Sequence, residues 1–539
     1  MDIRLVKQES METALTEPTP PSPARGGIEG GGEQWRWRAA VQLAALSVFP
    51  TVSLVAHSWG YRPSGATLLV ISAAWWTLAL AGAALLARAW GWRRAVVVAS
   101  MVTLGFFGWG ALVWAYGRIG SVGAGQHWFA GLVVAGALLA GYRWGEVDGF
   151  RRFMYVGSLS ILIVPGFQVV GLSLQSSAAP LRAPGAIEVG GPAHAELPDV
   201  YFVVVDGYGR QDVLAGRYGF RNDLLIDALE SEGFFVPRHA WANYSMTHAA
   251  IPSMLAMDYV LSPGQRVGSK ERLALYDVIG GDNPVVEYLR SAGYRYVHIE
   301  SDWAGSNCSE MADRCVPRYF LDESVWALIE KTPVEPAIRQ RVGHPHSQSS
   351  LHVFGHLLEE ALRPARDERP KFVYAHVLSP HPPLYLDRHC TLRLDSGLGG
   401  MNLTAPWDSE QSRAHRMAAY VEQVECVNQR ILEFVEHLAP EAVVLISADH
   451  GPDSRGQLFK PLAQWNREDV RERLAIFSAY RLPARCEPAQ DISSVNAFRL
   501  ILGCLFEGDL PHLATRHLLV PVPEVEGEGE VLEVVLQKP

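Results

Sequence analysis

The chain has 539 residues, a formal net charge of -10 and 48% hydrophobic residues. This length exceeds that of one ordinary domain, and the negative charge gives no reason to expect a nucleic acid as partner. The first third of the chain is much more apolar than the rest. The composition therefore predicts a membrane-embedded first part followed by a water-soluble part.

The first 34 residues are polar and rich in Pro and Gly, as in "TEPTPPSPARGG". This composition is typical of a disordered tail and not of a signal peptide. From residue 35 to residue 175, apolar stretches near the ~20 residues needed to cross a bilayer alternate with short loops that carry Arg or Gly. We predict five membrane-spanning helices, near residues 38–57, 66–88, 95–115, 126–142 and 154–174.

Arginines distinguish the two sides of the predicted spans. The richer side carries Arg36, Arg38, Arg88, Arg93, Arg94, Arg143, Arg151 and Arg152. The other side offers only Arg62 and Arg118 between spans. Because the richer side is normally cytoplasmic, residues 1–34 are predicted to be a cytoplasmic tail of a multi-pass protein of the cell membrane. With five spans, everything after about residue 175 is then extracytoplasmic.

A linker of small residues and Pro is predicted over residues 176–197, followed by an outer domain over residues 198–520. The acidic end, residues 521–539, is expected to be a solvated tail or an edge strand. All six cysteines lie in the exported part, where disulfides are permitted. Cys308 and Cys315 close a short loop and are the predicted pair, while the sequence leaves the other connectivity open.

Short apolar strands alternate with helical patterns in the outer domain. This alternation predicts an α/β fold with a mostly parallel sheet between helices. Helical spacing of apolar residues predicts helices within residues 221–234 and 420–438. The strand candidates are residues 199–206, 294–300, 371–378, 442–449 and 474–480.

Carboxylates and imidazoles follow three of these strands. Asp206 ends the first strand, His376 and His381 accompany the third, and Asp449 and His450 end the fourth. Each residue alone is most often a turn residue or a satisfied polar group, but the carboxyl ends of parallel strands meet at one edge of a sheet. Two Asp oxygens and one His nitrogen at that edge suit a divalent cation such as Zn²⁺ or Mn²⁺.

A candidate nucleophile lies in the segment "WANYSMTHAAIPSMLAMDY". A hydroxyl is a weak nucleophile at its free pKa, and coordination to a metal is one of the few ways to activate it. Thr247 is the candidate that we favour, and Ser245 and Ser253 are the competing hydroxyls.

Four motifs in this order resemble the alkaline phosphatase superfamily. They are the strand that ends in Asp206, Thr247 with Ser253 six residues later, the "PHPP" segment around His381, and "ADHG" with Asp449. The resemblance covers residues 198–520 and falls in the sulfatase-like branch of membrane-bound transferases. The architecture is most similar to lipoteichoic acid synthases and phosphoethanolamine transferases, which carry five membrane spans before an extracytoplasmic catalytic domain.

The resemblance implies roles for individual residues. It assigns the metal site to Asp206, Thr247, Asp449 and His450. It also makes Thr247 the nucleophile that takes up the transferred group, and it gives His381 the task of holding the head group or assisting the leaving group. Arg455 would meet a substrate anion, and His376 is expected to be structural.

Two departures from the wider superfamily narrow the expectation. Two-metal members carry a further Asp with a His four residues later, whereas Val377 stands at that distance before His381. We therefore expect one divalent metal ion. Formylglycine sulfatases need a "C/S-x-P-x-R" frame, which the segment at Thr247 lacks, and this argues against sulfate ester hydrolysis by that route.

The sequence thus predicts a membrane-bound, metal-dependent transferase of phosphoryl head groups, acting with Thr247 on a phospholipid or an envelope glycan. The nearest alternative is a hydrolase with the same site, either a phosphodiesterase or a sulfuric ester hydrolase. A non-catalytic membrane scaffold is the alternative from a different class.

Overall fold

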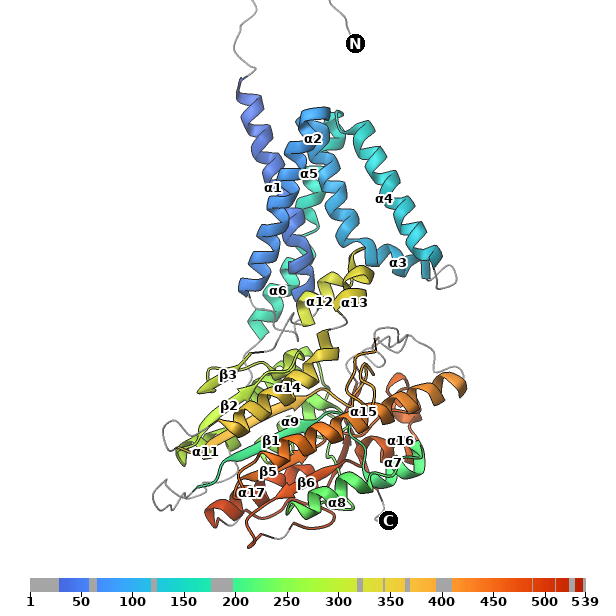
Figure 1. Cartoon of the computed structure of the whole chain (residues 1–539). Helices are drawn as coiled ribbons and strands as arrows, with labels where there is room; N and C mark the ends of the chain where they lie inside the picture. The colour runs from blue at the N-terminus through green and yellow to red at the C-terminus, as the bar shows by residue number, and fades with distance from the viewer. Residues whose placement is uncertain are drawn as a thin grey trace, which may run out of the picture.

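The structure is a computed structural model in which a helical bundle stands at one end of an α/β domain (Figure 1). It describes residues 29–57, 65–117, 124–175, 197–317, 323–342, 345–363, 369–393, 410–486, 488–508, 510–522 and 529–536. The tail predicted for residues 1–34 and the linker predicted for 176–197 lie almost entirely outside the described residues.

Six helices form the bundle. They are α1 (Glu29–His57), α2 (Gly65–Phe107), α3 (Trp109–Gly117), α4 (Ala124–Trp144), α5 (Asp148–Ser160) and α6 (Ile163–Gln175). Three helical stretches are long and apolar enough to cross a membrane, and they span Trp35–Ala56, Thr67–Phe107 and Asp148–Gly171. The helices therefore support three membrane-spanning candidates among the described residues, where the sequence predicted five spans.

Helix α2 accounts for part of this difference. Gly91 has a φ of 76° and interrupts the helical backbone between the spans predicted at 66–88 and 95–115. The helix rises and then returns, so that its two halves lie side by side (Figure 1). One stretch of 41 residues thus contains most of two predicted spans.

A six-stranded sheet in the order β3-β2-β4-β1-β5-β6 forms the centre of the outer domain. Its strands are β1 (Val200–Val205), β2 (Arg295–Ile299), β3 (Arg314–Val316), β4 (Lys371–Val377), β5 (Val443–Ser447) and β6 (Ser478–Arg481). Every pairing is parallel except that of β5 with the edge strand β6. The predicted mostly parallel sheet is confirmed, and β3 is the strand that the sequence pattern missed.

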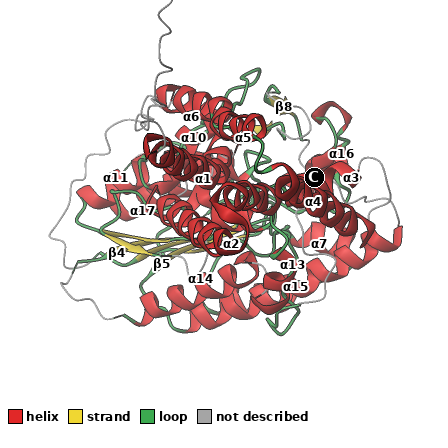
Figure 2. Ribbon diagram, turned by 90° about the horizontal axis from the view of Figure 1, so that it is seen from above, coloured by secondary structure: helices red, strands yellow, loops and turns green. Residues whose placement is uncertain are grey.

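Helices cover both faces of the sheet (Figure 2). The helices that follow β1 along the chain, including α12 and α13 outside these two layers, are α7 (Gln211–Tyr218), α8 (Asp223–Ser231), α9 (Thr247–Ala256), α10 (Ser269–Gly280), α11 (Pro284–Ser291), α12 (Glu323–Ile329), α13 (Glu335–Val342), α14 (Pro345–Leu362), α15 (Glu410–Glu436), α16 (Arg467–Leu474) and α17 (Ala497–Phe506). Both helices predicted from apolar spacing are present as α8 and α15.

Strand β1 shows how the layers are held together. Tyr201, Val203 and Val205 pack against α8, α14 and α15, whereas the alternate residues Val200, Phe202 and Val204 pack against α9, α11 and α17. Successive side chains of a strand point to opposite faces, so a strand buried on both faces is apolar throughout. Each such buried side chain contributes roughly 1.5–3 kcal/mol to stability.

A second, two-stranded sheet pairs β7 (His517–Leu519) with β8 (Leu532–Val534) in antiparallel fashion. Part of the acidic end therefore forms an edge strand, which is one of the two forms expected from the sequence. The residue before β8 is bonded to the main domain: Val531 donates its backbone N–H to the Gln265 carbonyl at 2.9 Å.

The bundle and the α/β domain touch at α12 and α13, which lie between them (Figure 1). Helix α12 packs against α1. The backbone N–H of Gly110 donates to the Lys331 carbonyl at 3.0 Å. A Cβ at Gly110 would lie 3.0 Å from Lys331 Cα, so the two backbones approach closely there.

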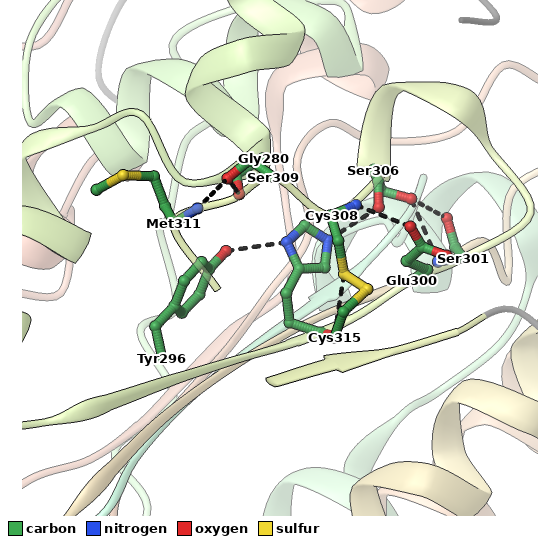
Figure 3. The surroundings of a disulfide bond; sticks show 10 residues. Gly280, Tyr296, Glu300, Ser301, Ser306, Cys308, Ser309, Met311 and Cys315 are labelled. Atoms are coloured by element: carbon green, nitrogen blue, oxygen red, sulfur yellow. Dashed lines mark hydrogen bonds between the residues drawn. A yellow bond between two sulfur atoms is a disulfide. The ribbon is translucent and has the colours of Figure 1, made fainter. Parts of the chain in front are cut away.

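The structure pairs all six cysteines, as Cys308–Cys315, Cys390–Cys426 and Cys486–Cys504. The predicted Cys308–Cys315 disulfide is confirmed. It joins β3 to the loop that follows β2, where Glu300 accepts from the Cys308 N–H at 2.9 Å (Figure 3). The bond therefore fastens the short edge strand that the sequence pattern missed.

Replacing both Cys308 and Cys315 by Ser is expected to lower the free energy of unfolding by roughly 2–3 kcal/mol, because the open loop gains freedom in the unfolded chain. Denaturant unfolding of the oxidised protein and of the double variant measures the difference. Equal unfolding free energies would show that the bond contributes nothing to stability.

Candidate active site

The ends of β1 and β4 are joined directly. The two strands run parallel with Val205 opposite Val377. Asp206 donates its backbone N–H to the Val377 carbonyl at 3.0 Å, and its own carbonyl accepts from the His381 N–H at 2.8 Å. The backbone therefore holds Asp206 and His381 side by side at the carboxyl edge of the sheet.

Gly207, which follows Asp206, lets the backbone come close to His381 and to Asp449. Its φ of 71° lies in the left-handed region, and a Cβ there would lie 3.3 Å from His381 Cα. Its N–H donates to Asp449 Oδ1 at 3.2 Å. A residue with a side chain would be strained at this position, so the glycine brings the β1 and β5 ends together.

Thr247 and His450 meet at this edge. Thr247 is the first residue of α9, and its Oγ1 lies 3.0 Å from His450 Nε2. The same nitrogen lies 3.2 Å from Asp449 Oδ2 and 3.5 Å from Asp206 Oδ1. The structure thus brings all four predicted metal-site residues together around one imidazole nitrogen.

The donor atoms fit a divalent cation. Asp206 Oδ1 and Asp449 Oδ2 are buried and have no hydrogen-bond partner among the described residues. Buried carboxylate oxygens without partners are costly. The ligand atoms are 3.0–3.5 Å from His450 Nε2, close to the ~3.3 Å edges of a tetrahedron with bonds of about 2.0–2.1 Å. Three of the predicted donor atoms therefore lie at spacings from His450 Nε2 that one bound cation could bridge.

Hydrogen bonds fix the tautomers of both histidines. His450 Nδ1 lies 3.1 Å from the Gly451 carbonyl, and His381 Nδ1 contacts the Pro382 carbonyl. A carbonyl only accepts, so both Nδ1 atoms carry the proton and both Nε2 atoms keep an open lone pair. Ligand atoms of Asp206, His381 and His450 lie within 4.8 Å of one another, which places His381 beside the metal-site residues.

The two buried carboxylates have opposite pKa shifts. Burial and then the negative charge of Asp206 raise the pKa of Asp449 to about 7. Burial opposes ionisation of Asp206 too, but the neighbouring histidines, His381 first, hold its pKa below the usual value. Without a cation, the pair therefore tends to share a single negative charge.

The competing hydroxyls are placed less favourably. Ser245 and Ser253 are fully buried, whereas Thr247 is partly exposed. Ser245 Oγ accepts from the Val520 N–H at 2.9 Å. Thr247 is the hydroxyl that contacts the metal-site residues.

Arg455 and His376 lie at different places relative to the predicted metal-site residues. Arg455 forms ion pairs with Asp469 at 3.1 Å and with Glu468. No hydrogen bond or ion pair joins it to the other predicted site residues, all of which the structure describes. His376, for which a structural role was expected, is fully buried; its Nε2 lies 3.3 Å from Asp206 Oδ2, and its ring packs edge-on against Trp303 with 5.4 Å between the ring centroids.

Sequence reasoning missed Arg473, near the end of α16. Its side chain is fully buried, and it lies close enough to Asp206 and Asp449 for their charges to act on it. Burial lowers the pKa of this guanidinium. No sequence signal marks it, because "REDVRERL" reads as an ordinary charged surface helix.

A model of the sulfatase family matches residues 198–506, which is more than half of the chain. The chain belongs to the sulfatase family. Membership of the alkaline phosphatase superfamily, predicted from the four motifs, is thereby confirmed. The matched range contains β1 to β6 and every predicted site residue of this sulfatase-family chain.

Solved structures are similar to this sulfatase-family chain at low identity. One is the C-terminal periplasmic domain of EcEptC from Escherichia coli, at 13% identity and a TM-score of 0.41, covering 66% of this chain and 96% of that one. Another is the integral membrane protein lipooligosaccharide phosphoethanolamine transferase A of Neisseria meningitidis, at 13% identity and a TM-score of 0.38, covering 86% and 95%. No curated protein matches the chain.

Proposed function

We propose that this protein is a membrane-bound, metal-dependent transferase that moves a phosphoryl head group from a phospholipid or a related phosphodiester to an acceptor hydroxyl. The observation that carries the proposal is the contact of a partly exposed Thr247 hydroxyl with His450, beside two buried carboxylate oxygens without partners. Membership of the sulfatase family supports an enzyme.

The residues Asp206, Thr247, Asp449 and His450 would hold one divalent cation, Zn²⁺ or Mn²⁺. Such an ion, when bound, lowers the pKa of a coordinated hydroxyl and neutralises charge on phosphoryl oxygens. Asp206 and Asp449 supply two negative charges from rigid strand ends, and the fixed tautomer of His450 supplies a lone pair.

In the first step, Thr247 Oγ1, having lost its proton to solvent, forms a bond to phosphorus, and the bond from phosphorus to the lipid oxygen breaks. That oxygen takes a proton from Nε2 of His381, which has first gained this proton from solvent. Burial lowers the pKa of His381, which makes its protonated form a stronger acid. In the second step, the acceptor oxygen forms a bond to phosphorus and gives its proton to His381, while Thr247 leaves and regains a proton from solvent.

Water as the acceptor would make the same site a hydrolase, and this is the second candidate function. The site residues are common to both, so the acceptor alone separates transfer from hydrolysis. We propose that Arg455 binds the substrate anion. To do so, it would exchange its ion pairs with Asp469 and Glu468 for that anion.

We also propose five membrane passes, with both halves of α2 counted separately because the helix folds back at Gly91. An odd number of passes, with the N-terminal tail in the cytoplasm, places residues 198–520 outside the cell membrane. The outer domain would then reach lipid head groups of the outer leaflet or an envelope glycan.

Intact mass and metal content of the full chain test the proposal. The protein in detergent is incubated with mixed vesicles of phosphatidylethanolamine and phosphatidylglycerol, beside the Thr247→Ala variant. One bound metal ion and a mass increment confined to the wild type are expected, and the size of the increment names the transferred group. A metal-free wild type without an increment, while the lipids stay accessible, contradicts the proposal and favours a scaffold.

Metal affinity is expected to depend on pH. Because the pKa of Asp449 is raised to about 7, a cation must displace its proton below that pH, and the apparent dissociation constant should rise about tenfold per pH unit of acidification. Above neutrality the apparent dissociation constant should become independent of pH. Asp206 stays ionised throughout, since its pKa is lowered. Competition with a Zn²⁺ chelator between about pH 5 and about pH 9 measures this profile, and a flat profile would contradict it.

A further inference from the structure

Arg473 joins the two loops that carry the nucleophile and the metal-site histidine. Its Nε donates to the Ser245 carbonyl at 2.8 Å, and its Nη1 donates to the Gly451 carbonyl at 2.9 Å. Ser245 stands two residues before Thr247, and Gly451 directly follows His450. One planar side chain therefore spans both loops.

The backbone of Arg473 strengthens one side of this link. Its carbonyl accepts from the Gly451 N–H at 2.7 Å. A Cβ at Gly451 would lie 2.0 Å from the Glu472 carbonyl oxygen, so this loop presses directly on α16. The loop after His450 is thus held against α16 by main chain and side chain together. The segment before Thr247 is joined to α16 by the Ala242 N–H, which donates to the Leu474 carbonyl at 2.8 Å. Closest to Thr247, the contacts with α16 come from the Arg473 side chain, through Nε to the Ser245 carbonyl and through Nη2 to Met246 Sδ at 3.9 Å.

The two N–H donors of the Arg473 guanidinium, Nε and Nη1, form a fork that joins the two loops. For holding the loops, this fork matters more than the positive charge alone. Arginine offers several N–H groups in a rigid plane, whereas lysine is a single point charge. A lysine at this position could keep a charge near Asp206 and Asp449, but its one ammonium group cannot reproduce the fixed spacing of two carbonyl contacts. The burial of Arg473, which is 2% exposed, excludes water as a ready substitute partner.

We propose that Arg473 is a positioning residue, whose two hydrogen bonds fix the Thr247 hydroxyl at its distance from His450 Nε2. The proposal rests on the proposed function in taking Thr247 as nucleophile and His450 as metal ligand. Arg473 itself touches neither the reacting atoms nor the cation in this arrangement. Loss of the fork lets the two loops shift relative to each other, and small misplacements at a reacting centre are costly.

Arg481 provides a matched control. It is also buried, at 8% exposure, and its Nε and Nη2 donate to the carbonyls of Ala442 and Ala439 at 3.1 and 2.7 Å. These contacts fasten β6 to the segment before β5, at the other end of that strand from His450. Arg481→Lys therefore removes the same kind of fork without touching either site loop.

The experiment compares wild type, Arg473→Lys and Arg481→Lys as full chains in detergent. The first readout is Zn²⁺ affinity by chelator competition, which needs no substrate. We expect about a tenfold to hundredfold weaker affinity for Arg473→Lys and no change beyond threefold, roughly, for Arg481→Lys. The second readout is the single-turnover rate of Thr247 adduct formation with the mixed vesicles, expected to fall about 100-fold for Arg473→Lys.

Each other result overturns the proposal. Wild-type affinity and rate in Arg473→Lys would show that charge alone matters, and equal losses in both lysine variants would show a general packing role. Should Arg473→Lys fail to fold, Arg473→Gln, which keeps one donor, replaces it with the same expectations. A wild type that binds Zn²⁺ but forms no adduct contradicts the proposed function only, and the affinity comparison still decides the role of Arg473.

Discussion

Replacing Thr247 by Ala is expected to reduce head-group transfer by about 10⁴-fold or more, since no other hydroxyl can take its place as nucleophile. Thr247 is partly exposed at the first turn of α9, so the loss of its side chain leaves no buried cavity. Turnover with the mixed vesicles and thermal unfolding, measured on the same preparation, check both parts of this expectation.

Two variants serve as controls for Thr247→Ala. Thr247→Ser keeps a hydroxyl at the same place and should retain measurable transfer. Ser253→Ala removes the competing hydroxyl from the interior of α9, which is fully buried, and should leave the rate per folded molecule close to that of the wild type. Transfer that survives in Thr247→Ala and disappears in Ser253→Ala would move the nucleophile to Ser253.

Asp449→Asn is expected to change activity and stability in opposite directions. The amide is a poor ligand, so Zn²⁺ affinity and turnover should each fall by about 100-fold or more. In the metal-free protein at alkaline pH, however, the free energy of unfolding of the variant should exceed that of the wild type by about 2 kcal/mol. The reason is that the pKa of Asp449 is raised by burial and by Asp206, so its ionisation above neutrality costs the wild type stability that an amide does not lose.

The sign of the stability change provides the check. A carboxyl whose pKa is raised in the folded state binds its proton more tightly there, so its destabilising effect is absent at low pH and grows as the pH rises. The advantage of Asp449→Asn should therefore vanish in acid. Adding Zn²⁺ should reverse the order, because the wild type binds the ion more tightly and is therefore stabilised more. A variant that is less stable than the metal-free wild type at every pH would contradict this account.

The sheet could be predicted from the sequence because its strands are buried on both faces. Such strands are apolar at nearly every position, and β1 shows this directly, while the equally buried β4 and β5 depart from it only at Lys371, His376 and Ser447. Strand β3 escaped detection because it has only three residues and pairs beside a disulfide. The structure has three membrane-spanning candidates where the sequence predicted five spans, because the spans predicted at 66–88 and 95–115 fall in the single helix α2, interrupted at Gly91, and the span predicted at 126–142 is not among the candidates.

The closeness of the proposed metal ligands Asp206, Asp449 and His450 could be predicted because they follow strands whose ends meet. Thr247 needed a further argument from chemistry, since it opens a helix instead of ending a strand. His376 and Arg473 could not be assigned, because their contacts depend on tertiary packing: His376 faces Asp206 across the β1–β4 pair, and Arg473 reaches two loops that lie far from it in sequence.

Gly110 and Lys331 join the helical bundle to the outer domain by a second route besides the linker. This bond, the close backbone approach at Gly110 and the packing of α12 against α1 oppose movement of the outer domain relative to the bundle. Under the proposed function, these contacts would favour one height of Thr247 above the bilayer. Under the proposed function, an acceptor is selected by how far its hydroxyl projects from the membrane as well as by its chemistry.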